Sequence, residues 1–112
     1  MPLLTIRTNI KLKDKRDIAE KASLTIANIL GKPESYVMVQ VEDKQCLIFA
    51  GEHDPCALLE LKSLGLPENT TADFSARLCE FMKIETQIDA SRIYIEFSSP
   101  ERHMWGWNQR TF

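Results

Sequence analysis

The chain has 112 residues, of which 44% are hydrophobic and 27% charged, and its formal net charge is −2. This is one domain's length with ordinary globular composition, so we expect a single domain over residues 1–112 and exclude a disordered, collagen-like or coiled-coil chain. The lack of a basic excess argues against a nucleic-acid partner, and no apolar run approaches the ~20 residues of a membrane span.

The cysteines and the first residues bear on where the protein works. Cys46, Cys56 and Cys79 are an odd number at irregular spacing, which predicts no disulfide framework and favours a reducing compartment. The opening stretch, MPLLTIRTNIKLK, lacks the basic and apolar regions of a signal peptide. We therefore expect a cytoplasmic protein, with secretion that needs no signal peptide as the alternative.

The first third of the chain is predicted to form a strand and a helix. Residues 3–8 alternate between two faces, as a strand does. Asp14 can cap a helix that runs to about Leu30, because apolar residues there recur at steps of three and four. Gly31 suits the left-handed position after a helix, and Pro33 prevents the helix from continuing.

The middle of the chain contains two predicted strands and one ambiguous segment. Residues 36–42 alternate around three valines, and residues 46–50 are predicted to be a short buried strand before a turn at 51–55. The composition of residues 56–64 favours a helix, whereas the internal repeat described below favours a strand.

The second half repeats the order strand, helix, strand. Asn69 or Thr70 can cap a second helix that runs to about Ile88, and residues 92–97 alternate like a strand. Each strand–helix–strand unit needs a crossover connection, so its two strands should be parallel. The predicted fold is α/β (α+β): duplicated β-α-β units form a four-stranded mixed sheet with two helices on one face.

The second face of this sheet is expected to be covered by other copies of the chain. The strands carry apolar residues on both sides, as at Met38 opposite Val37 and Val39. Parallel sheets are normally covered on both faces, and the sequence offers no third helix. The pattern therefore predicts a homo-oligomer.

Pro2 is the first candidate for catalysis. An initiator methionine is commonly removed before a small residue, which would leave a secondary amine at the start of a buried strand. An α-amino group titrates near pH ~8, and burial or a nearby cation lowers that pKa. The result would be a neutral base suited to general-base catalysis near neutral pH. Alternatively, proline stands here by chance.

Lys32 is the second candidate, because it lies between a helix and a strand at the end of the sheet where ligands of α/β proteins collect. Its charge could lower the pKa of the Pro2 amine and bind an anionic substrate or enolate. The alternative is a solvated lysine after a helix.

Other sites are weakly supported. His53 and Cys56 have H-x-x-C spacing, but His103 and the remaining cysteines add no paired spacing, so we expect no metal. Neither a C-x-x-C redox pair nor a glycine-rich phosphate loop is present, and we expect no cofactor. Trp105 and Trp107 either stack on a ligand or pack the C-terminal segment.

Five stretches in order, MPLLTIRTN, GKPESYVMVQV, DPCALLELKSLG, SRIYIEF and GWNQRTF, span nearly the whole chain. Together they resemble the macrophage migration inhibitory factor family, which includes D-dopachrome tautomerase. The resemblance implies a homotrimer in which three sheets surround a central channel, with residues 56–64 as a strand. It also implies keto–enol tautomerase activity on phenylpyruvate-like aromatic 2-oxo acids and dopachrome-like compounds, in a pocket between subunits.

The resemblance also assigns roles to individual residues. Pro2 would be the catalytic base, and Lys32 would hold the substrate carboxylate and the developing negative charge. The backbone N–H of Leu64 would donate to the same carboxylate. Tyr94 would line the pocket from the neighbouring subunit, and Trp107 and Phe112 would form apolar walls.

Three positions depart from the family pattern. Glu96 replaces an asparagine that contacts the distal hydroxyl of the substrate, so it would repel an acidic ring substituent. Trp105 replaces a small aliphatic residue and would narrow the pocket mouth. Leu59 replaces the second cysteine of the family's C-A-L-C segment, so thiol-redox activity should not be transferred.

Two other functions stay open. One is a cytokine-like protein that binds a receptor, with the tautomerase pocket secondary. The other is a different proton-transfer or hydrolytic activity of the wider superfamily, which generally uses extra arginines near the amino-terminal proline. Arg7 and Arg102 are the candidates for that role.

Overall fold

The computed structural model describes all 112 residues of the chain. Two helices and six strands follow one another as β1 Leu3–Thr8, α1 Lys15–Leu30, β2 Met38–Glu42, β3 Ala57–Lys62, α2 Thr71–Thr86, β4 Ile93–Ser98, β5 Gly106–Trp107 and β6 Arg110–Thr111. Single turns of 3-10 helix lie at Glu34–Tyr36, Glu68–Thr70, Ala90–Arg92 and Arg102–Met104. Segment 56–64, whose composition favours a helix, thus contains strand β3.

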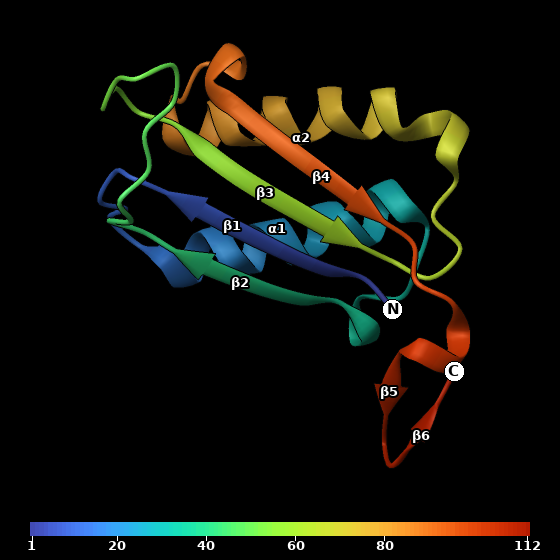
Figure 1. The fold of residues 1–112 in the computed structure, drawn as a ribbon. Helices are drawn as coiled ribbons and strands as arrows, with labels where there is room; N and C mark the ends of the chain where they lie inside the picture. The colour runs from blue at the N-terminus through green and yellow to red at the C-terminus, as the bar shows by residue number, and fades with distance from the viewer.

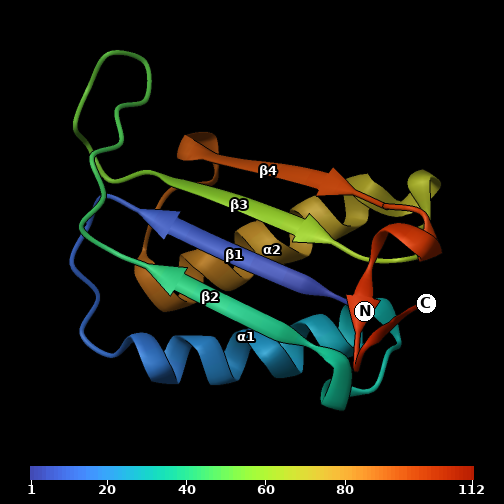
Figure 2. The same ribbon diagram turned by 60° about the horizontal axis from the view of Figure 1, so that its bottom comes forward.

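The sheet has the predicted duplicated architecture. Its strand order is β2-β1-β3-β4, with β1 parallel to β2, β3 parallel to β4, and β1 antiparallel to β3 at the centre. Both helices lie on one face of this mixed sheet (Figures 1 and 2). The small β5–β6 hairpin extends away from the sheet near the start of β1.

The core lies between the helices and the sheet. Sixteen buried apolar residues form one cluster, in which Leu4 and Ile6 of β1 meet Ile26 of α1 and Leu78 of α2. Each is shielded from water by both layers, so each contributes about 1.5–3 kcal/mol of burial free energy. Neither helix is both long enough and apolar enough to cross a membrane.

The two helices begin differently. The Asp14 carboxylate accepts from the Asp17 N–H at 3.0 Å, and Gly31 has a φ of 62° at the end of α1, both as predicted. Thr70 stands before α2, but its side chain makes no capping bond and donates instead to the Pro67 carbonyl at 3.0 Å. Capping of α2 by that hydroxyl is therefore a wrong prediction.

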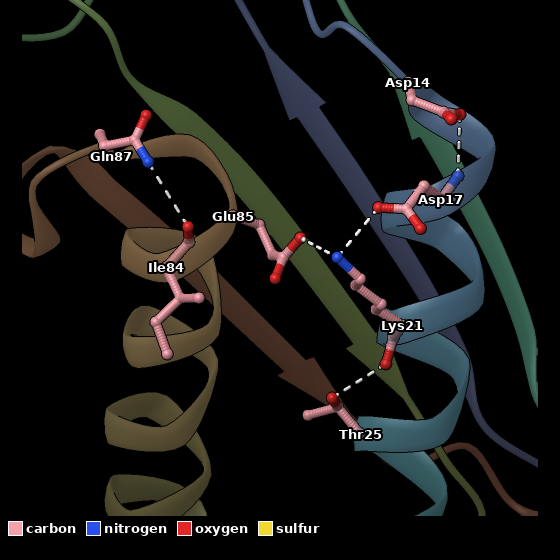
Figure 3. A network of polar contacts seen from close by, with 7 residues as sticks. All are labelled: Asp14, Asp17, Lys21, Thr25, Ile84, Glu85 and Gln87. Atoms are coloured by element: carbon pink, nitrogen blue, oxygen red, sulfur yellow. Dashed lines mark hydrogen bonds and ion pairs between the residues drawn. The ribbon is translucent and has the colours of Figure 1, made fainter.

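A cation joins the two helices on their outer side (Figure 3). The Lys21 ammonium contacts Asp17 of its own helix at 3.0 Å and Glu85 of α2 at 3.3 Å. Hydrogen bonds to Asp17 and then Glu85 raise the pKa of Lys21 above its usual value. The contact with Glu85 is an ion pair between the two helices.

Two strand predictions need correction. Tyr36, the first residue of segment 36–42, is the last residue of a 3-10 turn at Glu34–Tyr36, and β2 begins only at Met38. Residues 46–50 are not a buried strand: they belong to the β2–β3 loop (residues 43–56), where one isolated bridge joins Phe49 to Glu52. Their apolar composition is typical of a strand, but they pair with neither edge strand of the sheet, β2 or β4.

Side chains hold the β2–β3 loop in place. The Arg92 guanidinium donates to the carbonyls of Pro55 and Asp54 at 3.0 Å and to those of Phe49 and Glu52 at 3.3 Å. It also stacks on the Phe49 ring, 5.3 Å from the centroid. One side chain thus replaces the ladder bonds that this segment lacks.

The uncovered face of the sheet is more polar than predicted. A row across its middle contains Gln40, Thr5, Glu60 and Glu96 in register. Apolar side chains stand only nearer its ends, such as Met38 at 67% exposure. The apolar-cover argument for oligomerisation therefore applies to the ends of this face and not to its centre.

Candidate functional site

A largely apolar pocket of about 390 Å³ opens beside the start of β1. It is lined by the chain's first residues, the turn before β2 and the C-terminal hairpin: Met1, Pro2, Leu3, Ser35, Tyr36, Val37, Met38, Trp105, Gly106, Trp107 and Phe112. No acidic side chain is among them. Four residues named from the sequence therefore meet here: Pro2, Trp105, Trp107 and Phe112.

Pro2 is fixed at the pocket by the central strand. Its side chain is fully buried, and its carbonyl oxygen accepts from the Met38 N–H at 3.0 Å, which continues the β1–β2 pairing by one residue. The residue therefore shares the rigidity of a strand paired on both sides. A base built on this backbone needs no side-chain ordering when substrate binds.

The pocket disfavours a charged amino terminus. Burial lowers the pKa of the Met1 amine from 8.0 to about 6, with contributions from the charge and a hydrogen bond of Lys32 and from the charge of Arg102. An amine with this pKa is mainly neutral at pH 7. We predicted that burial and a nearby cation lower the pKa of the Pro2 amine. Both effects act on the amine of the neighbouring residue, Met1.

Lys32 and Leu64 meet at the same end of the sheet. The Lys32 ammonium donates to the Leu64 carbonyl oxygen at 2.6 Å, and no carboxylate pairs with it. Leu64 is buried, and none of the backbone hydrogen bonds outside helices and strands uses its N–H. A cation and an unused amide donor are therefore available to an anion.

An aromatic wall closes the outer side of the pocket. Trp107 and Phe112 are stacked with centroids 5.7 Å apart, and Tyr36 meets Trp107 edge to face at 5.8 Å. The Phe112 N–H donates to the Trp105 carbonyl at 3.1 Å, which folds the hairpin onto this wall. Sequence reasoning missed Tyr36 as a site residue, because a strand was expected there and the structure has a turn.

Tyr94 and Glu96 lie outside this pocket. Tyr94 is paired with Leu58, which is paired with Arg7 near the far end of β1, so it is distant from Pro2 within one chain. Tyr94 is 66% exposed, and its ring contacts that of Phe49, with centroids 4.8 Å apart. Glu96 is exposed on the uncovered face of the sheet. A single chain therefore does not assemble the complete predicted site.

The two candidate arginines differ in their partners. Arg7 pairs with Glu42 at 3.3 Å and Glu60 at 3.5 Å, so its charge is balanced on the uncovered face. Arg102 donates through Nε to the main-chain oxygen of the pocket residue Phe112, the last residue of the chain, at 3.1 Å. The sequence could not distinguish them, because their partners come from distant segments.

The cysteine and histidine side chains do not cluster into a metal site or a disulfide. No group of three His, Cys, Asp or Glu side chains is placed to hold a metal ion. All three cysteines are free; Cys56 is buried, and burial raises the pKa of the Cys79 thiol. His53 and Cys56 acquire no further partners of this kind.

Comparison with known proteins places the whole chain in one group. The family model described as macrophage migration inhibitory factor (MIF) matches residues 1–112. A macrophage migration inhibitory factor homolog of Brugia malayi is 38% identical, and the match covers 100% of this chain and 99% of the relative. The Trichinella spiralis MIF structure superposes with a TM-score of 0.93 at 36% identity, over 98% of this chain and 99% of that one. The structure of a macrophage migration inhibitory factor homologue from Prochlorococcus marinus superposes with a TM-score of 0.93 at 33% identity, and the match covers 98% of both chains.

Proposed function

Because the chain belongs to the macrophage migration inhibitory factor family, we propose that it is a keto–enol tautomerase with Pro2 as its general base. The substrates proposed are phenylpyruvate-like aromatic 2-oxo acids, with dopachrome-like compounds as a further class. One observation carries this proposal: the amino terminus lies in an apolar pocket, where burial and Lys32 hold the pKa of the Met1 amine at about 6.

In the proposed mechanism, removal of Met1 makes the Pro2 nitrogen a secondary amine at the pocket. As a neutral base it takes a proton from the carbon next to the ketone and then returns a proton to the oxygen, which completes the enol and restores the neutral amine. Negative charge develops on that oxygen during the transfer. Lys32 stabilises this charge and the carboxylate, and the Leu64 N–H donates to the same carboxylate.

We propose further that the site is completed by a second subunit of a homotrimer. Tyr94 stands exposed at the end of the sheet opposite to Pro2, where its own chain cannot use it. The β5–β6 hairpin with its aromatic residues also extends away from the sheet (Figure 1), and we propose that it meets a neighbouring subunit. Three sheets around a channel would bring Tyr94 of one subunit to the pocket of the next.

Two residues are proposed to set the substrate preference. Trp105 lines the pocket and narrows it, which favours a flat aromatic ring over a branched one. Glu96 is exposed and would approach the distal end of the substrate from the neighbouring subunit. Its carboxylate would accept from a ring hydroxyl and repel an acidic ring substituent.

The test is an ultraviolet assay of phenylpyruvate tautomerisation by purified protein, whose loss of Met1 is first verified by intact-mass spectrometry. Wild type should be active, and Pro2→Gly should lose at least about a hundredfold, the lower range for a general base. Leu24→Ala, an exposed change on α1, is the matched control and should retain activity. Equal rates for wild type and Pro2→Gly would remove Pro2 from the mechanism.

A second candidate function is a cytokine-like protein that binds a receptor. It is favoured by the name of the Brugia malayi relative, a macrophage migration inhibitory factor homolog. A macrophage migration assay would compare wild type with Pro2→Gly. Inhibition of migration by both proteins, with no tautomerase activity in wild type, would favour this second function.

A further inference from the structure

The indole of Trp107 is the part of the aromatic pocket wall that depends most on the C-terminal hairpin. Trp107 lines the pocket and is 44% exposed, and its one aromatic partner outside the C-terminal segment is Tyr36, which meets it edge to face. Its other aromatic partner, Phe112, belongs to the same C-terminal segment. The position of this indole is therefore set largely by how the hairpin itself is held.

The β5–β6 hairpin has few contacts of its own to hold it. Its two strands have two residues each, and an isolated two-stranded hairpin is only marginally stable. The two residues of its turn, Asn108 and Gln109, both have positive φ, 52° and 64°. Gln109 thus stands where such a turn prefers glycine, and its side chain opposes the turn. Contacts between the two strands are needed to offset this strain.

Arg110 supplies such a contact. It is paired with Trp107 across the hairpin, and its guanidinium carbon lies over the indole ring, 5.3 Å from the centroid. At this distance a cation is attracted to the face of an aromatic ring, and tryptophan is the best partner. No aspartate or glutamate pairs with Arg110, which is exposed and is not among the residues that line the pocket. Its charge therefore acts on the indole from outside the pocket.

We propose that Arg110 is a positioning residue of this pocket, which holds the indole of Trp107 in the wall through a cation–π contact. A flat aromatic ligand gains most from an indole fixed in this way, because two rings stack only in defined orientations. The preference of the pocket for an aromatic over an aliphatic carboxylate then depends on a residue outside its lining. The inference rests on the proposed function for the class of substrate, whereas its central test measures binding and needs no activity.

The test compares two ligands of equal charge and similar size, 3-phenylpropanoate and 3-cyclohexylpropanoate, by isothermal titration calorimetry. Wild type should bind the phenyl ligand more tightly. Arg110→Gln removes the charge and should lower the ratio of the two affinities about threefold, the factor that corresponds to an exposed cation–π contact. Arg110→Lys keeps the charge without the flat guanidinium and should retain part of this ratio.

A second measurement follows the indole itself. In a Trp105→Phe background, Trp107 is the only tryptophan of the chain. Addition of Arg110→Gln should make its fluorescence more readily quenched by acrylamide, because the indole loses a contact that holds it in the wall. Arg77→Gln, which removes an exposed charge from α2, is the matched control. It should change neither the quenching nor the ratio of affinities.

Four results would overturn the proposal. Two are equal affinity of wild type for the two ligands and an unchanged ratio in Arg110→Gln. If Arg110→Lys lost as much of the ratio as Arg110→Gln, the charge would not be the cause. A lower ratio in Arg77→Gln would attribute the effect to the net charge of the protein and not to the contact with Trp107.

Kinetics separate this proposal from the proposed function. In Arg110→Gln, KM for phenylpyruvate should rise about threefold while kcat stays unchanged, because Arg110 acts on the wall and not on the base. A lower kcat with an unchanged KM would place Arg110 in the chemistry and overturn its positioning role. If wild type preferred the phenyl ligand but did not tautomerise phenylpyruvate, the tautomerase would be rejected and the role of Arg110 in binding retained.

Discussion

The ammonium group of Lys32 donates a hydrogen bond of 2.6 Å to the carbonyl oxygen of Leu64. The bond joins the segment after α1 to the segment after β3, and so links the two repeated halves of the chain near the amino terminus. It also orients a half-buried cation that no carboxylate balances. The charge of this cation acts on the amino terminus beside it.

The first prediction concerns Lys32→Gln and pH. The base works in its neutral form, so kcat/KM should rise as pH increases through the amine pKa. The positive charge of Lys32 lowers that pKa, and its removal should therefore move the acid limb of the profile to higher pH. KM for phenylpyruvate should rise about tenfold, which corresponds to ~1.4 kcal/mol.

The measurement is kcat/KM for phenylpyruvate across weakly acid to weakly alkaline pH. Lys13→Gln removes an exposed charge away from the amine and serves as the control. An acid limb at the same pH in Lys32→Gln and wild type would show that this charge does not tune the base.

The second prediction tests the shared site by mixing subunits. Pro2→Gly lacks the base, and Tyr94→Ala lacks the residue proposed to come from the neighbour. In trimers reassembled from equal amounts of both, about one quarter of the sites should combine an intact Pro2 with an intact Tyr94, if assembly is random. Activity should then exceed that of the two separate variants averaged. If the mixed trimers had only the mean activity of the two variants, either both residues would act in the site of a single chain or Tyr94 would take no part in the site.

The third prediction concerns the β2–β3 loop. Arg92→Lys keeps the charge but loses the fork that reaches four carbonyls and the flat surface that stacks on Phe49. Hydrogen exchange should become faster over residues 47–55, with little change in the core strands. Arg16→Lys, on the exposed surface of α1, should leave that exchange unchanged. Uniform acceleration over the whole chain would instead indicate global destabilisation.

The fourth prediction concerns the core. Leu59 is 0% exposed and lies between Ile6 and Ile95 in the sheet, so Leu59→Ala should lower the free energy of unfolding by about 2–5 kcal/mol. Leu24 on α1 is 56% exposed, and Leu24→Ala should change it by less than about 0.5 kcal/mol. Urea denaturation of both variants provides the comparison. Similar losses in the two would contradict the burial argument.

The elements with strong local signals could be predicted from the sequence. The apolar stripe between Asp14 and Gly31 is a property of neighbouring residues, and the structure has that helix with those ends. Residues 46–50 carried an equally apolar pattern and form no strand. A strand needs a partner edge, and pairing between distant segments is absent from local composition.

For the candidate site too, the chemistry of single residues could be predicted from the sequence, whereas their arrangement in space could not. Pro2 and Lys32 were recognisable as residues, because an amine and an ammonium have chemistry of their own. Only folding places the charge of Lys32 beside the amino terminus. Tyr94 was assigned by resemblance, and the sheet register places it away from Pro2.

The two arginines give the physical reason most clearly. Residue type and charge can be read from the sequence, and by these two properties Arg7 and Arg102 are equivalent candidates. Sheet register sets Arg7 beside Glu42 and within reach of Glu60, which balances its charge. The C-terminal turn sets Arg102 beside the main-chain oxygen of Phe112, the last residue of the chain. Electrostatic energy depends on separation in space, so the partner of each cation was decided only when the chain folded.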